Sequence, residues 1–156
     1  MKRFLPLTLI AATALAGCNQ PAKHRNSAPD AKPGITVASG RLVLPAVKGN
    51  PGAAYFDLAN GNGAPTMLVA VAVDGAGKAE MHTIADGSMS TLPPVPLAPG
   101  SSVRFEPGAN HVMVFDLADR LVAGGETEMT LTFADGDKVS APLNIEAAGG
   151  DMEQMH

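Results

Sequence analysis

The sequence predicts an all-β domain, folded as an antiparallel β-sandwich or barrel. From residue 35 onward, short apolar runs are separated by turn residues, chiefly Gly, Pro, Asn and Asp. Several runs alternate apolar and polar side chains, which is the period of a strand with one face in a core. No stretch shows the period of about 3.6 residues that marks a long amphipathic helix. Many short strands at this spacing are typical of sandwiches and barrels.

Turn signals such as Asp74-Gly75 and Asp86-Gly87 divide this region into eight expected strands. Met67 and Met129 each lie in an alternating run with other apolar residues. We therefore expect both to fill the core, a task that suits the flexible thioether. The expected strands are Ile35–Leu44, Ala53–Leu58, Thr66–Val73, Ala79–Ile84, Ser102–Phe105, His111–Leu117, Glu128–Phe133 and Val139–Ile145.

The composition excludes several kinds of site. The 156 residues contain one Cys, which rules out an intramolecular disulfide, a multi-thiolate zinc site and a four-Cys iron–sulfur cluster. A net charge of −4 offers no basic surface for nucleic acid. The chain has no Gly-x-Ser-x-Gly, His-Glu-x-x-His or phosphate-loop motif. We therefore predict a single domain that binds no nucleic acid and is not an enzyme, with redox chemistry at a metal as an open alternative.

Residues 1–17 have the layout of a bacterial lipoprotein signal peptide. Two basic residues, Lys2 and Arg3, precede an apolar stretch that is too short to span a bilayer comfortably. The segment ends in Leu15-Ala16-Gly17-Cys18, which resembles a lipobox, whose Cys receives the lipid anchor. Asn19, where an Asp would favour the inner membrane, weakly favours the outer membrane of a Gram-negative envelope, and both membranes stay open. We predict a protein of the periplasm or cell envelope that is anchored to a membrane through Cys18; an ordinary signal peptide with a chance Cys is the alternative.

Polar segments flank the predicted domain, which covers residues 35–147. Residues 18–34 include three Pro and lack apolar periodicity, so we expect a flexible tether with His24 as a solvated linker residue. Residues 148–156 form a polar tail. The tail contains Met152, Met155 and His156.

Other methionines and histidines form a pattern that is typical of a soft metal site. His111 and Met113 are two residues apart on one expected strand, so both project from the same face, roughly 7 Å apart at the backbone. His82 lies on an earlier expected strand, and Met89 lies in the loop that follows it. Imidazole and thioether without thiolate suit Cu(I), whereas Mg²⁺ and Ca²⁺ prefer carboxylates and zinc rarely uses Met. A core position for the histidines is the alternative, and Met81 faces away from His82 in a regular strand.

From about Ile35 to Ala147 the chain resembles the periplasmic copper chaperones called PCu(A)C, a family of cupredoxin-like β-sandwich domains. The family's copper motif is a His, ten residues, a Met, 21 residues and then His-x-Met. Here 21 residues separate Met89 from His111, and His111-Val112-Met113 supplies the end. The segments that carry the resemblance are Ala53-Ala54-Tyr55-Phe56 with Asn60, Ala79-Glu80-Met81-His82, Asp86-Gly87-Ser88-Met89, Pro107-Gly108-Ala109-Asn110-His111-Val112-Met113 and Leu131-Thr132-Phe133-Ala134-Asp135-Gly136.

The resemblance implies a copper site made by His82, Met89, His111 and Met113. The first loop departs from the family pattern, because six residues rather than ten separate His82 from Met89. Family members often have Met-x-Met after the Gly, where this chain has Met89-Ser90-Thr91, so the usual liganding Met can correspond to Thr91. Some relatives also carry a C-terminal extension with Met and His. By this resemblance, Met152, Met155 and His156 are auxiliary metal candidates.

The resemblance also implies a function. We expect an envelope copper chaperone that binds Cu(I), with Cu(II) as an open alternative, and passes it to an acceptor in the assembly of the copper centre of cytochrome c oxidase. The expected acceptor is an oxidase subunit or a thioredoxin-like assembly factor, and we expect the chaperone to be a monomer. A blue-copper electron carrier is excluded, since it needs a Cys thiolate and none follows residue 18. Copper storage or tolerance, and a non-metal protein-interaction module, are the alternatives.

Overall fold

The computed structural model describes residues 32–61 and 63–149, and within them the chain is all-β, as predicted. The predicted signal peptide, Cys18, His24 and the metal candidates of the tail lie outside the described residues. The described part has no helix that could cross a membrane. Its strands are β1 (Ile35–Val43), β2 (Gly52–Asn60), β3 (Thr66–Val73), β4 (Ala76–Ala85), β5 (Ser88–Thr91), β6 (Val95–Leu97), β7 (Ser101–Phe105), β8 (His111–Leu117), β9 (Glu126–Phe133) and β10 (Lys138–Glu146).

All eight expected strands are present, and two further strands have no counterpart in the prediction. The first of these, β5, is exposed along its whole length, so no buried alternation marks it in the sequence. The second, β6, has three residues, of which Pro96 is one. Both are held by pairing with a neighbouring strand rather than by a strong period of their own.

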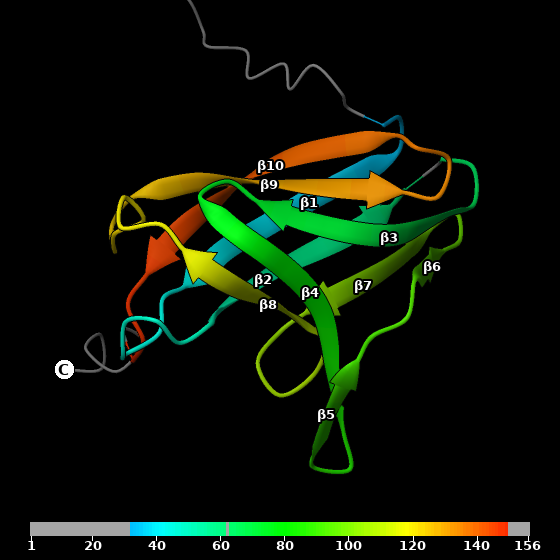
Figure 1. Cartoon of the computed structure of the whole chain (residues 1–156). Coiled ribbons are helices and arrows are strands. Elements are labelled where there is room, and N and C mark those ends of the chain that lie inside the picture. The colour runs from blue at the N-terminus through cyan, green and yellow to red at the C-terminus, as the bar shows by residue number, and fades with distance from the viewer. Residues whose placement is uncertain (1–31, 62, 150–156) are drawn as a thin grey trace, which may run out of the picture.

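One continuous sheet folds over on itself to make the sandwich. Its strand order is β5-β4-β8-β2-β1-β10-β9-β3-β6, and β7 also pairs with β2. One edge of β2 is divided, because its second half pairs with β7 and its first three residues pair with β8. Figure 1 shows the two layers and the β4–β5 hairpin, which projects from the body of the domain. The end of β4, the start of β8 and the short β5 therefore lie together at one end of the sheet.

One pair of strands differs from the predicted antiparallel arrangement. β1 and β10 run parallel, with Leu42 opposite Ile145 and Val43 opposite Glu146. The other strand pairs of the described sheet are antiparallel. β1 and β10 come from the two ends of the domain, so no hairpin turn sets their relative direction.

Aromatic side chains from several strands fill the core. Phe56, Phe105 and Phe133 are each only 1% exposed. The rings of Phe56 and Phe105 stack with their centroids 4.4 Å apart. Met129 is 0% exposed, which confirms its predicted core position. The sandwich thus has a packed interior without Trp and without a disulfide.

Met67 does not share this core, and its predicted position is wrong. Its side chain is on the exposed side of β3, at 38% exposure, while its neighbour Leu68 is fully buried. The β3–β9 ladder shifts register between Leu68 and Ala70. An irregularity of this kind changes which face of the strand the following residues occupy, so the alternation that includes Val71 does not extend back to Met67.

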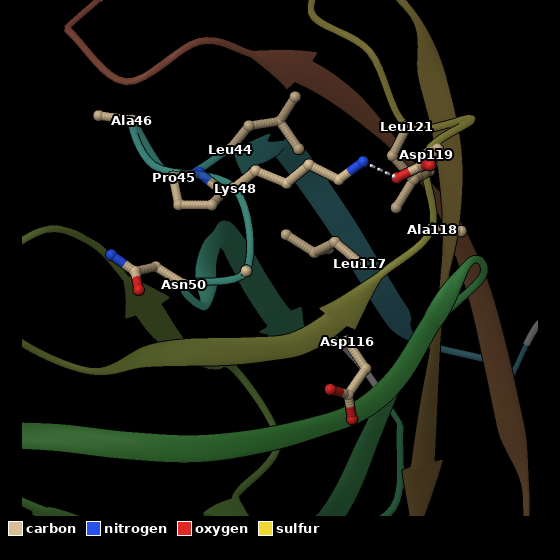
Figure 2. A pocket seen from close by; sticks show the side chains of 11 residues that line it. Leu44, Pro45, Ala46, Lys48, Asn50, Asp116, Leu117, Ala118, Asp119 and Leu121 are labelled. Atoms are coloured by element: carbon tan, nitrogen blue, oxygen red, sulfur yellow. Dashed lines mark ion pairs between the residues drawn. The ribbon is translucent and has the colours of Figure 1, made fainter.

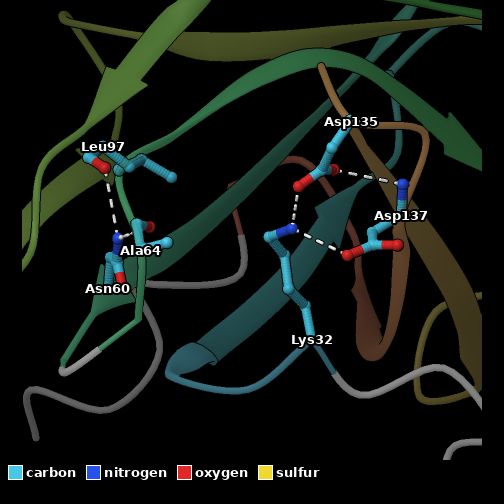
Figure 3. A network of polar contacts seen from close by, with 6 residues as sticks. All are labelled: Lys32, Asn60, Ala64, Leu97, Asp135 and Asp137. Carbon is cyan, nitrogen blue, oxygen red and sulfur yellow. Dashed lines mark hydrogen bonds and ion pairs between the residues drawn. The ribbon is translucent and has the colours of Figure 1, made fainter.

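Asn60 is fully buried and its amide ties three segments together. Its Nδ2 donates to the carbonyl oxygens of Ala64 and Leu97, at 3.0 and 3.1 Å (Figure 3). Its Oδ1 accepts a hydrogen bond from the amide of Gly63 at 3.0 Å. A buried amide with these partners is satisfied, so Asn60 is a structural residue rather than a candidate ligand.

Lys32 fastens the start of the described chain to the turn between β9 and β10. Its ammonium forms ion pairs with Asp135 and with Asp137 (Figure 3). The same ammonium lies 5.6 Å from the centroid of the Phe133 ring. The hydrogen bond from Lys32 holds the pKa of Asp135 below its ordinary value. Lys32, three residues before the first strand, is therefore in contact with the packed domain.

Candidate metal centre

The pairing of β4 with β8 brings the two predicted histidine ligands together. His82 lies directly opposite His111 in this antiparallel ladder. Their rings are tilted by 38° and their centroids are 6.1 Å apart. A single ion can therefore contact both imidazoles with small adjustments of the side chains.

Met113 lies on the same face of the sheet as the two histidines. It is two residues from His111 on β8 and is paired with Glu80, which is two residues from His82 on β4. The residue between them, Val112, is fully buried on the core face. The prediction that His111 and Met113 project from the same face is therefore confirmed.

Met81 lies on the core face and not at the site. It is paired with Val112 and is 8% exposed. The expectation that Met81 faces away from His82 is confirmed.

The ring of His82 has unpartnered nitrogen atoms. Both Nδ1 and Nε2 are shut off from water, and neither has a hydrogen-bond partner among the described residues. The carboxylate of Glu80 lies close to Nε2, but its Oε2 is 3.8 Å away and thus outside hydrogen-bond distance. Buried polar atoms are nearly always satisfied, so this exception requires an explanation, and an ion that binds the ring would provide one.

His111 is 5% exposed and has a defined orientation. Its Nδ1 lies 2.9 Å from the carbonyl oxygen of Ala109. A carbonyl only accepts, so Nδ1 is the protonated nitrogen and Nε2 keeps its lone pair. The tight loop before β8 places this carbonyl, because the amide of Ala109 donates to the carbonyl of Glu106 and the amide of Glu106 donates to that of Asn110. A metal-binding histidine commonly has this arrangement, with its second nitrogen held by a backbone carbonyl.

Met89 lies on β5, not in a loop as predicted. Two residues, Asp86 and Gly87, form the turn of the β4–β5 hairpin, and Met89 is paired with Ile84. Thr91 is the residue directly opposite His82. Met89 shares the face of Thr91 and His82, two residues further toward the turn, and is 53% exposed.

Glu80 is a neighbour of the site that the sequence reasoning did not single out. Its position two residues before His82 on a strand is the signal that would have found it, since such residues share a face. Lys78 donates to its carboxylate at 2.8 Å, and this hydrogen bond lowers the pKa of Glu80. Glu80 therefore places a negative charge beside His82 at neutral pH.

The donor set is soft and nitrogen-rich. Among the described residues, no group of three or more His, Cys, Asp or Glu side chains is arranged to hold a metal. An ion at the histidine pair would therefore need a thioether as its next donor, which Met113 offers. Two imidazoles and a neutral sulfur suit Cu(I) better than a hard divalent cation.

A separate cavity of about 590 Å³ lies at the other end of β8 (Figure 2). Its lining includes the side chains of Leu44, Leu117 and Leu121, and Lys48 pairs with Asp119 across it at 2.6 Å. It contains no His or Met, so it is not part of the candidate metal centre.

The model of the LpqE-like lipoprotein family matches residues 35–145, which is most of the chain. The chain belongs to this family. No curated protein sequence gives a significant match.

PCuAC domains are similar to this LpqE-like protein in structure. The copper-bound PCuAC domain from PmoF2 is 25% identical, with a TM-score of 0.64 over 75% of this chain and 96% of that one. The apo PCuAC domain from PmoF1 is 29% identical, with a TM-score of 0.62 over 76% of this chain and 96% of that one. Cu(I)-bound DR1885 from Deinococcus radiodurans shares the fold. It is 21% identical, with a TM-score of 0.60 over 81% of this chain and 86% of that one. These similarities confirm the predicted resemblance to PCu(A)C proteins and the β-sandwich fold.

Proposed function

We propose that this LpqE-like protein is a copper chaperone of the cell envelope that binds Cu(I) through His82, His111 and Met113. One observation carries the proposal: two imidazoles face each other on adjacent strands, one with both nitrogens unpartnered and the other with its Nε2 left free. The similarity to a copper-bound PCuAC domain supports copper as the cargo.

The three donors suit transfer as well as binding. All are neutral, so Cu(I) keeps its single positive charge and is held without a thiolate. An incoming thiolate, imidazole or thioether of an acceptor replaces one ligand at a time, and Met113 is the first to leave because a thioether is the weakest donor of the three. No substrate bond is broken, and the function proposed is binding and transfer rather than catalysis.

The finer parts of the proposal concern location and partner. We propose that Cys18 carries the lipid anchor and that the acceptor belongs to the assembly of an oxidase copper centre, as an oxidase subunit or a thioredoxin-like factor. Storage or tolerance predicts binding without transfer. Met152, Met155 and His156 are proposed auxiliary ligands, and deletion of residues 148–156 tests them through the copper stoichiometry.

Competition with a coloured Cu(I) chelator tests the proposal directly. His111→Ala and Met113→Ala are expected to lower the affinity by at least about 100-fold, since loss of even the outer partners of metal ligands costs about 10–100-fold. Met67→Ala is the matched control, because Met67 is an exposed methionine on a different strand. Affinities equal to wild type in both site variants would leave the non-metal interaction module as the better hypothesis.

A further inference from the structure

We infer that Met89 is not a permanent ligand of the bound ion but an entry and exit ligand, which holds Cu(I) together with His82 while the ion moves between the solvent and the inner donors. This inference rests on the proposed function. It concerns how the ion reaches His82, His111 and Met113, and it gives different roles to two methionines that both lie on the site's face.

The strand register places the two methionines on opposite sides of the histidine pair. Met113 lies opposite Glu80, two residues before His82 on β4. Met89 lies opposite Ile84, two residues after His82. Two interstrand spacings and four residues separate them, which is about 16 Å between their Cα atoms. Two extended methionines that share one ion reach about 13 Å, with metal–sulfur bonds of about 2.3 Å. One ion therefore contacts one of these sulfurs at a time.

Met113 is the inner of the two sulfur donors. It is adjacent to His111 on the same face and diagonal to His82, within about 8 Å of each at the backbone. Met89 is diagonal to His82 but lies two strands away from His111, about 12 Å at the backbone. An ion shared by both imidazoles is thus within reach of Met113, while Met89 meets the ion only beside His82.

The hairpin turn prevents Met89 from moving opposite His82. The turn residues Asp86 and Gly87 have φ of 51° and 75°, and Asp-Gly is a favoured pair for such a turn. A slip of two residues would make Ala85 and Asp86 the turn, and the left-handed conformation costs Ala about 1–2 kcal/mol. The position opposite His82 therefore belongs to Thr91, which offers no sulfur.

Exposure falls along the proposed route. Met89 is 53% exposed, the side chain of His82 is 18% exposed and His111 is 5% exposed. The His82 ring is not fixed by a hydrogen bond at either nitrogen, whereas the ring of His111 is held by the carbonyl of Ala109. His82 can therefore turn with the ion from Met89 toward His111. The Cu–S bond to Met89 breaks as the bond to Met113 forms, and copper stays Cu(I) throughout.

Stopped-flow exchange with a coloured Cu(I) chelator tests this role in the full-length chain. Met89→Ala is expected to slow loading and release together, each on the order of tenfold, with an affinity within about threefold of wild type, because the residue acts on the path and not on the end state. Met67→Ala controls for loss of an exposed thioether. Faster release with a tenfold loss of affinity would make Met89 a permanent ligand, and unchanged rates would remove it from the route; either result overturns the inference. Failure of the wild-type protein to bind Cu(I) would instead overturn the proposed function.

A second variant tests the geometry by adding a sulfur. Thr91 is exposed, so Thr91→Met preserves the fold and places a thioether directly opposite His82. We expect affinity to rise and release to slow by about tenfold, with two Cu–S contacts in X-ray absorption where wild type has one. Two Cu–S contacts already in wild type, or one in the variant, would contradict the register argument.

Discussion

The two faces of the β4–β8 pair are made from consecutive residues and have opposite characters. On one face Met81 packs against Val112, and both are buried in the core. On the other face the next pair is His82 with His111, and both ring nitrogens of His82 are shut off from water without a hydrogen-bond partner. The same backbone thus carries a packed apolar pair and, one residue away, a histidine pair in which the His82 ring is unsatisfied.

The difference teaches where stability and function separate in this domain. The core face gains free energy from burial of apolar surface. The histidine face loses free energy in the absence of an ion, because an unsatisfied buried polar group costs about 1–3 kcal/mol. A protein retains such a cost where the group has a task in binding.

The largest expected effect is on the free energy of unfolding, and it differs between the two methionines that lie on opposite faces, Met81 and Met113. Met81→Ala should lower the free energy of unfolding by about 2–5 kcal/mol, since it leaves a cavity in the core. Met113→Ala should lower it by less than about 1 kcal/mol, because its side chain is only partly buried. Urea unfolding of the two apo variants measures this. A loss of stability in Met113→Ala equal to that in Met81→Ala would show that both faces belong to the core.

The next largest effect is a gain in stability rather than a loss. His82→Phe replaces the unpartnered ring with an apolar one of similar shape, and we expect the apo protein to gain about 1–2 kcal/mol. The same variant should lose high-affinity Cu(I) binding. Thermal unfolding and chelator competition measure the two changes. Destabilisation of apo His82→Phe would mean that the His82 nitrogens are satisfied in solution.

A smaller effect belongs to the charge beside the site. The lowered pKa of Glu80 keeps its carboxylate ionised at neutral pH, 3.8 Å from His82. Glu80→Gln removes an attraction for the cation, and a partly exposed charge of this kind should change Cu(I) affinity by about threefold. Raising the salt concentration should shrink the difference between variant and wild type. A difference that persists at high salt would point to a direct bond between Glu80 and the ion.

The smallest expected effect on stability concerns the ion pairs of Lys32 with Asp135 and Asp137, far from both faces of the β4–β8 pair. The pKa of Asp135 is lowered from 3.8 and that of Lys32 is raised from 10.5 by their contact. The pair therefore contributes its stability between these two values, loses it as the pH falls through the lowered pKa of Asp135, and loses it as the pH rises through the raised pKa of Lys32. Lys32→Met should show a flatter melting temperature at both extremes of pH, with Cu(I) affinity unchanged. A pH profile of the melting temperature identical to that of wild type would show that these ion pairs do not contribute to the stability of the domain.

The sequence predicted the fold and the histidine face for clear physical reasons. The alternation of His111 and Met113 with buried valines specifies both faces of β8, and eight strands carry a similar signal. The residue that lies opposite His82 on β5, which is Thr91, could not be predicted. Its position depends on an exposed strand, β5, and on the length of the turn that precedes this strand. Met67 was assigned to the core because a register shift within β3 leaves no mark in the local sequence.

The position of Tyr55 gives the candidate site a built-in optical reporter. The chain has one Tyr and no Trp, so all of its ultraviolet emission above the phenylalanine band comes from this ring. Tyr55 shares the face of Ala53, which pairs with Met113, and Arg41 stacks over it at 5.1 Å. We expect copper at the adjacent donors to quench this emission, so loading can be followed in the unlabelled protein by fluorescence alone.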